Sequence, residues 1–185
     1  MNVNAEKINI AVIGLGYVGL PLAVEFSKHF SVIGFDLDIK RIKELKRGYD
    51  KTNEISSDVL SKTKQLIFTE LENKIKKSNI YIITVPTPVD KNNKPDLQPL
   101  IKASKMIGKM TMPNDVIIYE STVFPGATEE ICVPILEKES KLSYNKGFYC
   151  GYSPERINPG DKEHTLPNIK KITSGSNKET ALFVD

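Results

Sequence analysis

Only two cysteines occur among the 185 residues of this sequence. Cys132 and Cys150 are too few for a disulfide framework, and their separation does not fit a metal site. The sequence also lacks an apolar run long enough to span a bilayer, and its uncharged stretch at residues 9–24 has no signal-peptide cleavage pattern. We therefore expect a reduced, cytoplasmic protein with no metal ion and no membrane partner.

A large excess of charge of one sign is absent as well. The chain carries 26 Lys and Arg residues against 23 Asp and Glu residues, and the two signs are interleaved. The densest basic run, Lys74-Ile75-Lys76-Lys77, is typical of a solvated helix face. We expect no nucleic-acid partner, while the net charge of +3 would suit an anionic cofactor and an anionic substrate.

Short apolar runs alternate along the chain with longer amphipathic patterns. The predicted strands cover residues 8–13, 31–35, 80–85, 116–119 and 148–152, with weaker candidates at 66–69 and 171–174. The predicted helices cover residues 18–30, 40–47, 97–109 and 128–138. This alternation is typical of βαβ units. We expect residues 1–185 to form one α/β domain of the Rossmann type, a doubly wound and mainly parallel sheet with helices on both faces.

Two polar, proline-rich loops, residues 86–95 and 158–167, directly follow predicted strands. In open parallel sheets the ligand lies beyond the carboxyl ends of the strands. Both loops are therefore expected near the ligand.

The first predicted strand runs directly into Gly14-Leu15-Gly16-Tyr17-Val18-Gly19, a Gly-x-Gly-x-x-Gly motif. The motif needs Gly14 for a tight turn, Gly16 for close approach of the backbone to a pyrophosphate, and Gly19 for close packing of helix on strand. The pyrophosphate would lie at the positive end of the following helix. This segment, including Tyr17 and Val18, is a candidate dinucleotide site.

An acidic residue follows at the spacing that such a site requires. Asp36 ends the second predicted strand, about 20 residues after the glycine motif. Its carboxylate can accept hydrogen bonds from both adenosine ribose hydroxyls and would repel a 2′-phosphate, which favours NAD over NADP. Asp38 is a candidate N-cap of the next helix. Arg41 is either a surface cation or a further cofactor contact.

At this point the chain resembles the UDP-glucose/GDP-mannose dehydrogenase family over essentially all of its length. The resemblance rests on these motifs in order: Gly14-Leu15-Gly16-Tyr17-Val18-Gly19-Leu20-Pro21, Asp36 with Arg41, Val85-Pro86-Thr87-Pro88, Asp96-Leu97, Glu120-Ser121-Thr122-Val123 with Pro125-Gly126, and Ser153-Pro154-Glu155. It implies a four-electron oxidation, in which the C6 hydroxymethyl group of a nucleotide sugar becomes an aldehyde and then an acid. Two NAD are consumed, and a cysteine carries the thiohemiacetal and thioester intermediates.

The resemblance also implies roles for individual residues. Glu155 would be the base for thioester hydrolysis, and Thr122 would position the catalytic water. The residues expected to line the nicotinamide end of the cofactor site are Val85, Thr87, Ser121, Thr122 and Val123. From the residues alone, the favoured reading of Glu155 is a loop carboxylate in a surface ion pair, and that of Thr122 is a capping or turn residue.

One departure from the family pattern bears on the substrate. Enzymes for UDP-glucose commonly carry a second glutamate four residues after the catalytic one, and here that position is Pro159. The run from Gly151 to Lys162 instead resembles the branch that acts on UDP-N-acetylhexosamines. That branch makes uronic acids for surface polysaccharides, so a UDP-sugar is the expected substrate.

Cys132 and Cys150 do not stand where the family places its nucleophile. The resemblance puts that cysteine and a catalytic lysine beyond these residues, together with a central helix and a UDP-binding domain. We therefore expect a fragment of a longer, homodimeric enzyme that is inactive alone. Three alternatives stay open: a stand-alone NAD-binding regulatory module, a UDP-glucose 6-dehydrogenase, and a 3-hydroxyacid-type dehydrogenase.

Overall fold

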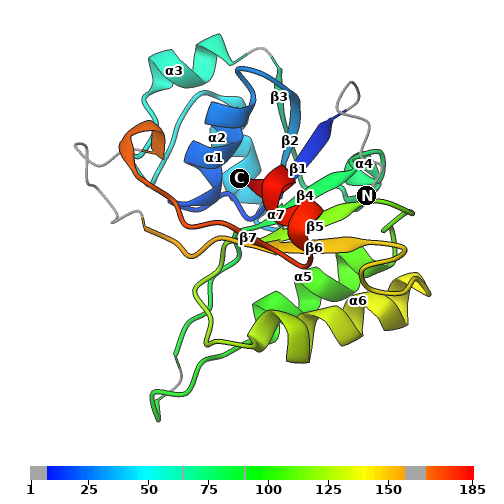
Figure 1. Ribbon diagram of the computed structural model, residues 1–185. Helices are drawn as coiled ribbons and strands as arrows, with labels where there is room; N and C mark the ends of the chain where they lie inside the picture. The colour runs from blue at the N-terminus through cyan, green and yellow to red at the C-terminus, as the bar shows by residue number, and fades with distance from the viewer. Residues whose placement is uncertain (1–7, 64, 90, 157–165) are drawn as a thin grey trace.

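The computed structural model describes residues 8–63, 65–89, 91–156 and 166–185. Its centre is a seven-stranded sheet in the order β3-β2-β1-β4-β5-β6-β7 (Figure 1). The strands are β1 Asn9–Ile13, β2 Ser31–Phe35, β3 Leu66–Thr69, β4 Ile80–Ile83, β5 Val116–Tyr119, β6 Tyr149–Tyr152 and β7 Ser174–Gly175. All neighbouring strands are parallel except β6 and β7, so the mainly parallel sheet is confirmed.

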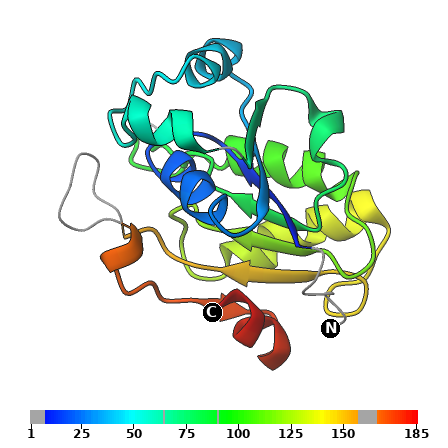
Figure 2. The same ribbon diagram turned by 90° about the horizontal axis from the view of Figure 1, so that it is seen from above.

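Successive residues of the central strands face opposite sides of the sheet and enter two separate cores. In β1, Ile10 and Val12 pack on one side, and Ala11 and Ile13 on the other. The first core is covered by α1 (Gly19–Phe26), α2 (Ile39–Lys46) and α3 (Ser57–Lys62), and the second by α5 (Gln98–Gly108) and α6 (Val133–Ser140) (Figures 1 and 2). The sheet is therefore doubly wound, as predicted.

The predicted helices are present, but two of them have different ends. The first stops at Phe26 instead of residue 30, because the chain turns at Ser27, whose hydroxyl donates to the Val24 carbonyl at 2.7 Å. The helix predicted over 128–138 is present, but its first part is a π-helix, η2 (Thr128–Cys132), which leads directly into α6 ending at Ser140. Pro134 in the first turn of α6 has no N–H for the i→i−4 pattern.

Two further short helices are α4 (Glu72–Ile75), which contains Lys74 of the basic run, and α7 (Lys178–Val184). Two short elements had no sequence prediction: α3 and the 3-10 turn η3 (Leu166–Asn168). Each spans too few residues to show a helical period. The weak strand predicted at 171–174 is displaced, because β7 pairs only through Ser174 and Gly175. Most of the predicted loop 158–167, including Pro159, lies outside the described residues.

Several predictions from composition can be compared with this fold. Cys132 and Cys150 are both buried and unbridged. Lys74, Lys76 and Lys77 are exposed around the buried Ile75, as expected of a solvated helix face. Among the described residues, no helix is long and apolar enough to cross a membrane, and no group of three or more potential ligands could hold a metal ion.

The strand order places a crevice between β1 and β4. From β1 the chain goes outward to β2 and β3, then crosses back to β4 on the other side of β1. The segments that leave the carboxyl ends of β1 and β4 therefore diverge. Such a switch point is where open α/β sheets bind ligands.

At the opposite edge of the sheet, directly before β5, Asp115 is 4% exposed. Burial raises the pKa of its carboxyl group to about 7, although the Met112 N–H donates to it at 2.8 Å. The folded-state pKa thus exceeds the unfolded-state value of 3.8. Asp115 then contributes stability that is complete below the unfolded-state pKa and is lost as the pH rises through about 7.

We expect Asp115→Asn to remove this pH dependence, because the amide keeps an acceptor for Met112 but does not ionise. Between about pH 5 and pH 8, the unfolding free energy of the native protein should fall by about 1–3 kcal/mol relative to the variant. Urea unfolding at both pH values measures the difference. Parallel pH profiles of the two proteins would contradict the assignment.

Candidate functional site

The glycine motif forms the turn from β1 into α1. Gly14 has φ +97°, a conformation that favours glycine. A Cβ on Gly19 would lie 1.9 Å from the Gly14 carbonyl oxygen, so only glycine lets α1 approach the turn. These two predicted roles are confirmed. A Cβ on Gly16 would meet nothing within 4 Å, so the backbone of Gly16 borders open space.

Two features of this turn favour the binding of an anion. The hydroxyl of Thr84, just after β4, donates to the Gly14 carbonyl at 2.7 Å and fixes the turn from behind. At the N-terminus of α1, Val18 is the N-cap residue and no side chain makes a capping hydrogen bond. The N–H groups and the positive end of the helix dipole can therefore act on a ligand.

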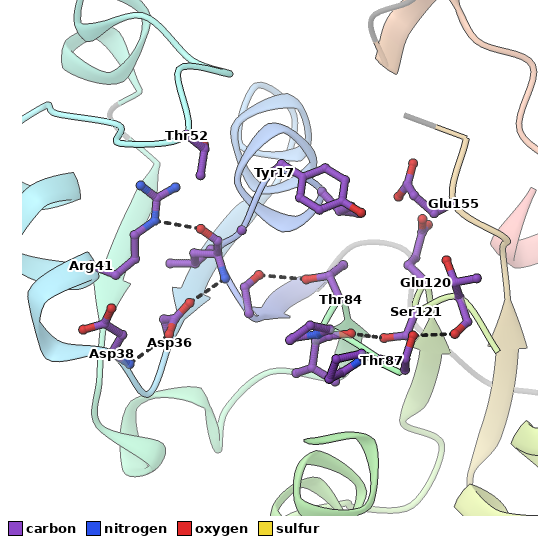
Figure 3. Close-up of a pocket in the computed structure, with 18 of the residues that line it drawn as sticks. Tyr17, Asp36, Asp38, Arg41, Thr52, Thr84, Thr87, Glu120, Ser121 and Glu155 are labelled. Atoms are coloured by element: carbon purple, nitrogen blue, oxygen red, sulfur yellow. Dashed lines mark hydrogen bonds between the residues drawn. The ribbon is translucent and has the colours of Figure 1, made fainter. Parts of the chain in front are cut away.

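Asp36 lies at the end of β2, beside the glycine turn. The backbone N–H of Leu15 donates to its Oδ2 at 2.8 Å, and the N–H of Asp38 donates to its Oδ1 at 2.9 Å (Figure 3). The carboxylate is thus fixed by one hydrogen bond to each oxygen, and each oxygen keeps acceptor capacity for a ligand. Asp38 caps α2 by accepting from the Lys40 N–H, as predicted.

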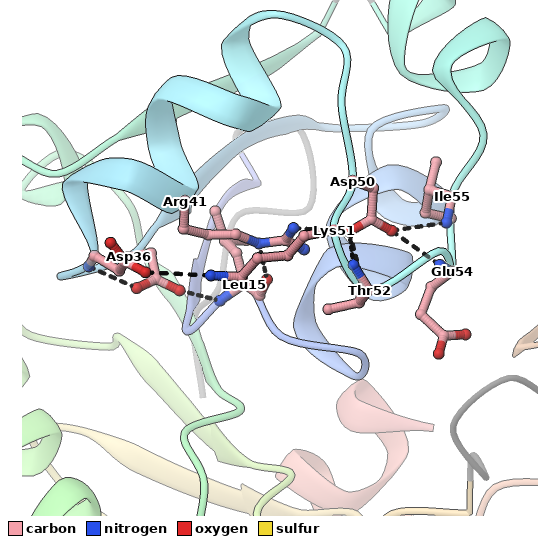
Figure 4. A network of polar contacts seen from close by, with 9 residues as sticks. Leu15, Asp36, Arg41, Asp50, Lys51, Thr52, Glu54 and Ile55 are labelled. Atoms are coloured by element: carbon pink, nitrogen blue, oxygen red, sulfur yellow. Dashed lines mark hydrogen bonds and ion pairs between the residues drawn. The ribbon is translucent and has the colours of Figure 1, made fainter.

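Arg41 is buried, with 2% exposure, which excludes the surface cation weighed from the sequence. Its Nε donates to the Leu15 carbonyl at 2.8 Å, and its guanidinium pairs with Asp50 at 2.7 Å (Figure 4). Arg41 also lines the cavity described below, so the second possibility, a cofactor contact, stays a prediction.

Asp50 organises the loop that follows α2. Its carboxylate accepts hydrogen bonds from the backbone N–H groups of Thr52, Glu54 and Ile55 and from the Thr52 hydroxyl, at 2.7–3.0 Å. Burial alone would raise the pKa of Asp50, but these bonds and the Arg41 guanidinium hold it below its usual value. The loop thereby presents Lys51 and Thr52 to the same side as the glycine turn.

The segments after β4 and β5 are joined by two short hydrogen bonds. The Ser121 hydroxyl donates to the Val85 carbonyl, and the Thr87 hydroxyl donates to the Thr122 carbonyl, each at 2.6 Å (Figure 3). Four of the residues predicted at the nicotinamide end are therefore held together. Val123 instead packs against the core beneath α5 and α6.

Two carboxylates lie at the far end of these segments. Glu155 follows β6, and Glu120 follows β5 (Figure 3). The Lys171 ammonium binds the carboxylate of Glu120. Burial raises the pKa of Glu120; the Lys171 charge lowers it, the nearby Glu155 raises it, and the net pKa lies above the usual value. Glu155 is half-buried, not a fully exposed loop carboxylate.

These groups surround one cavity of about 550 Å³ at the carboxyl edge of the sheet. The predicted residues that line it are Gly14, Gly16, Tyr17, Val18, Asp36, Arg41, Val85, Thr87, Ser121, Thr122 and Glu155. Gly19 and Val123 do not line it. Figure 3 shows Tyr17 between the Asp36 end and the Glu155 end, with its hydroxyl directed toward the carboxylates.

A second cavity of about 490 Å³ shares Gly14, Asp36, Val85 and Pro86 with the first. It extends from the exposed Leu37 toward Met106 of α5. The two cavities together form a channel across the ends of β2, β1, β4 and β5. Such a channel suits an elongated ligand with one end at Glu155 and the other at Leu37.

Sequence reasoning missed several residues at this site. Glu120 directly follows the strand predicted at 116–119, and that position was the available signal. Thr84 lies inside the strand predicted at 80–85, whereas the observed β4 ends at Ile83. Thr52 gave no signal, because its approach to the cavity depends on the fold of the loop around Asp50. Lys171 is brought to Glu120 across 51 residues, and no local pattern reports such a contact.

Known proteins that are similar to this chain show which family carries its glycine turn and Asp36. The model of the UDP-glucose/GDP-mannose dehydrogenase family, NAD binding domain, matches residues 8–184. The chain belongs to this family. The resemblance found in the sequence is therefore confirmed, the cofactor is NAD, and the chain does not belong with 3-hydroxyacid-type dehydrogenases.

Members of this family are similar to the chain over nearly its whole length. UDP-N-acetyl-D-glucosamine 6-dehydrogenase of Pseudomonas aeruginosa is 56% identical over 180 residues, which is 97% of this chain and 43% of that protein. Protein CapL of Staphylococcus aureus is 57% identical over 176 residues, 95% of this chain and 41% of that protein. The structure of UDP-D-ManNAc dehydrogenase from Pyrococcus horikoshii matches with a TM-score of 0.86 at 31% identity, covering 95% of this chain and 43% of that one.

The chain thus spans about two fifths of the length of the curated relatives that it matches. The residues of this NAD-binding domain fit the cofactor. The cradle at Gly16, the uncapped N-terminus of α1 and the carboxylate of Asp36 have the chemistry that a dinucleotide requires.

Proposed function

We propose that this chain is the NAD-binding part of a longer enzyme that oxidises the C6 hydroxyl group of a UDP-N-acetylhexosamine to a carboxylate. The observation that carries the proposal is the identity of 56% to a UDP-N-acetyl-D-glucosamine 6-dehydrogenase over 97% of the chain. The remainder of that enzyme would supply the nucleophilic cysteine, the catalytic lysine, the central helix and the UDP-binding domain. The uronic acid so formed would serve surface polysaccharide synthesis, as the resemblance to the UDP-N-acetylhexosamine branch implies.

The shape of the channel suggests which residues would hold each part of NAD. The N–H groups at the start of α1 would bind the pyrophosphate beside Gly16, and Asp36 would accept from the adenosine ribose. The cavity between Leu37 and Met106 would take the adenine ring. Bound NAD supplies the hydride acceptor for the oxidation. Its nicotinamide end would lie beside the joined segments that carry Val85 and Ser121.

Glu155 and Thr122 line the same end of the cavity, which supports the roles that the family resemblance implies. The Thr122 carbonyl accepts from Thr87, and this bond restrains the segment without using the Thr122 hydroxyl. That hydroxyl would orient a water molecule, and the Glu155 carboxylate would accept its proton during hydrolysis of the acyl intermediate.

We expect Asp36→Ala to weaken NAD binding about 10- to 150-fold, because a charge-assisted hydrogen bond is worth about 1.5–3 kcal/mol. The affinity for NADP should fall less or rise, since the carboxylate that repels a 2′-phosphate is gone. Calorimetric titration with both cofactors measures this. Asp58→Ala is the matched control, because that carboxylate is exposed on α3 and lines neither cavity. Unchanged NAD affinity in Asp36→Ala would remove Asp36 from the site.

The substrate class is tested with the full-length enzyme. Initial rates of NADH formation should give a larger kcat/KM for UDP-GlcNAc or UDP-GalNAc than for UDP-glucose or GDP-mannose. A preference for UDP-glucose would favour the UDP-glucose 6-dehydrogenase alternative. NAD binding without oxidation of any sugar nucleotide by the full-length protein would favour the regulatory module.

We further propose that the enzyme is a cytoplasmic homodimer, and light scattering on the full-length protein tests the dimer.

A further inference from the structure

The ion pair between Glu120 and Lys171 is a feature that the proposed roles of Glu155 and Thr122 do not use. The side chains are 8% and 17% exposed, and the Lys171 ammonium binds Oε2 of Glu120. Glu120 lines the channel together with Glu155, and it also lines a separate cavity of about 300 Å³ beneath the channel. Lys171 lines the lower cavity and not the channel, so it binds Glu120 from the side of the lower cavity.

The charged and titratable groups around Glu120 come from four segments. Glu155 and Tyr152 belong to β6 and the residues after it, and each interacts electrostatically with Glu120. Lys171 precedes β7. Across the lower cavity lie two further carboxylates, Glu25 and Asp185.

These last two carboxylates have partners of their own. Glu25 pairs with Lys28 at 2.7 Å, and Asp185 accepts from the Thr173 hydroxyl at 2.7 Å. Lys171 is therefore the cation that pairs with Glu120 among the described residues around these two cavities.

Two carboxylates that face one partly enclosed cavity repel each other, and without a cation one of them takes up a proton. Lys171 makes this protonation unnecessary, because its positive charge directly compensates the negative charge of Glu120. Glu155 is then left to exchange protons with the water and the substrate in the channel. The partly buried Lys171 also fixes the position of Glu120, since the buried Glu120 carboxylate is costly without its counter-ion.

We propose that Glu120 and Lys171 are positioning residues of the dehydrogenase, a compensated ion pair behind the channel that leaves Glu155 to act as the proton acceptor. The inference rests on the proposed function, because it gives the pair a part in that reaction. Neither residue needs to touch the substrate. The pair acts through the charge that it presents to Glu155.

The ion pair itself is tested in the 185-residue chain by side-chain carboxyl NMR. Lys171→Gln should raise the pKa of Glu120 by about 1 unit or more, and Lys171→Arg should restore it. The matched control is Lys170→Gln, which removes the same charge from the neighbouring exposed residue and should leave the pKa unchanged. An unchanged pKa of Glu120 in Lys171→Gln, with the fold intact, would overturn the inference.

The role of the pair is tested in the full-length enzyme by the pH dependence of kcat/KM. The acidic limb should move to higher pH in Lys171→Gln and to lower pH in Glu120→Gln, where the positive charge of Lys171 is no longer compensated by Glu120. Lys171→Arg should keep the native profile. Acidic limbs that coincide in all variants would overturn the positioning role even if NMR confirms the pair. A native enzyme that oxidises no UDP-sugar would instead refute the proposed function, and the NMR experiment still reports on the ion pair.

Discussion

Alanine substitutions at two glycines of the same turn are expected to have different effects, a loss of stability at Gly19 and a loss of NAD affinity at Gly16. Gly19→Ala should destabilise the domain by roughly 3 kcal/mol or more, because the new Cβ would lie 1.9 Å from the Gly14 carbonyl oxygen and 2.4 Å from the Thr84 hydroxyl oxygen. Both α1 and β4 would have to move to relieve these contacts. Urea unfolding measures the loss.

Gly16→Ala is the matched variant, three residues away. Its Cβ would meet nothing within 4 Å, so the unfolding free energy should change by less than about 0.5 kcal/mol. The same methyl group would project where the pyrophosphate has to approach the backbone, so NAD affinity should fall at least about tenfold. A Gly16→Ala domain that is stable and binds NAD normally would show that the dinucleotide does not cross this turn.

The second large effect is expected at the Arg41–Asp50 ion pair. Arg41→Met should cost about 3–5 kcal/mol of unfolding free energy, because it leaves the buried Asp50 carboxylate without its counter-ion. The Leu15 carbonyl loses its donor as well. Arg47→Met is the control, since Arg47 is an exposed arginine just past the end of α2, and it should change stability by less than about 0.5 kcal/mol.

A double variant separates the charge effect from lost packing. Arg41→Met with Asp50→Asn should recover part of the loss, because the amide oxygen can still accept hydrogen bonds from Thr52 and Ile55 without carrying a charge. Urea unfolding of the four proteins gives the coupling. A loss in Arg41→Met no greater than in Arg47→Met would show that the ion pair does not hold the loop in solution.

The parts of the site that the sequence predicts are those in which neighbouring residues determine the geometry. The roles of Gly14 and Gly19 follow from a turn of six residues, and the position of Asp36 follows from the short α1–β2 unit after it. Strand positions also follow from local composition, because strands covered on both faces are nearly continuous apolar runs. These features account for the sheet order around β1, the channel and the cofactor.

Contacts between distant segments were not predictable in this way. The partner of Arg41 depends on how the loop at residues 50–55 folds back, and the partner of Glu120 comes from 51 residues further along the chain. Hydrophobic periodicity reports which face of an element is buried, not which polar group meets another across the fold. For the same reason, the weak strand predicted at 171–174 overlaps the observed β7 only at Ser174, and its pairing with β6 was not predicted.

The central claim is that this chain holds NAD at the carboxyl edge of its sheet, and a heteronuclear NMR titration of the 185-residue chain with NAD tests it most directly. We expect shifts for backbone amides at residues 15–18, 36–38, 84, 85, 87 and 120–122, which line the channel. Amides at the opposite edge, at residues 31–33 and 77–79, should stay unchanged. Shifts confined to that opposite edge, or no shifts at millimolar NAD, would contradict the account.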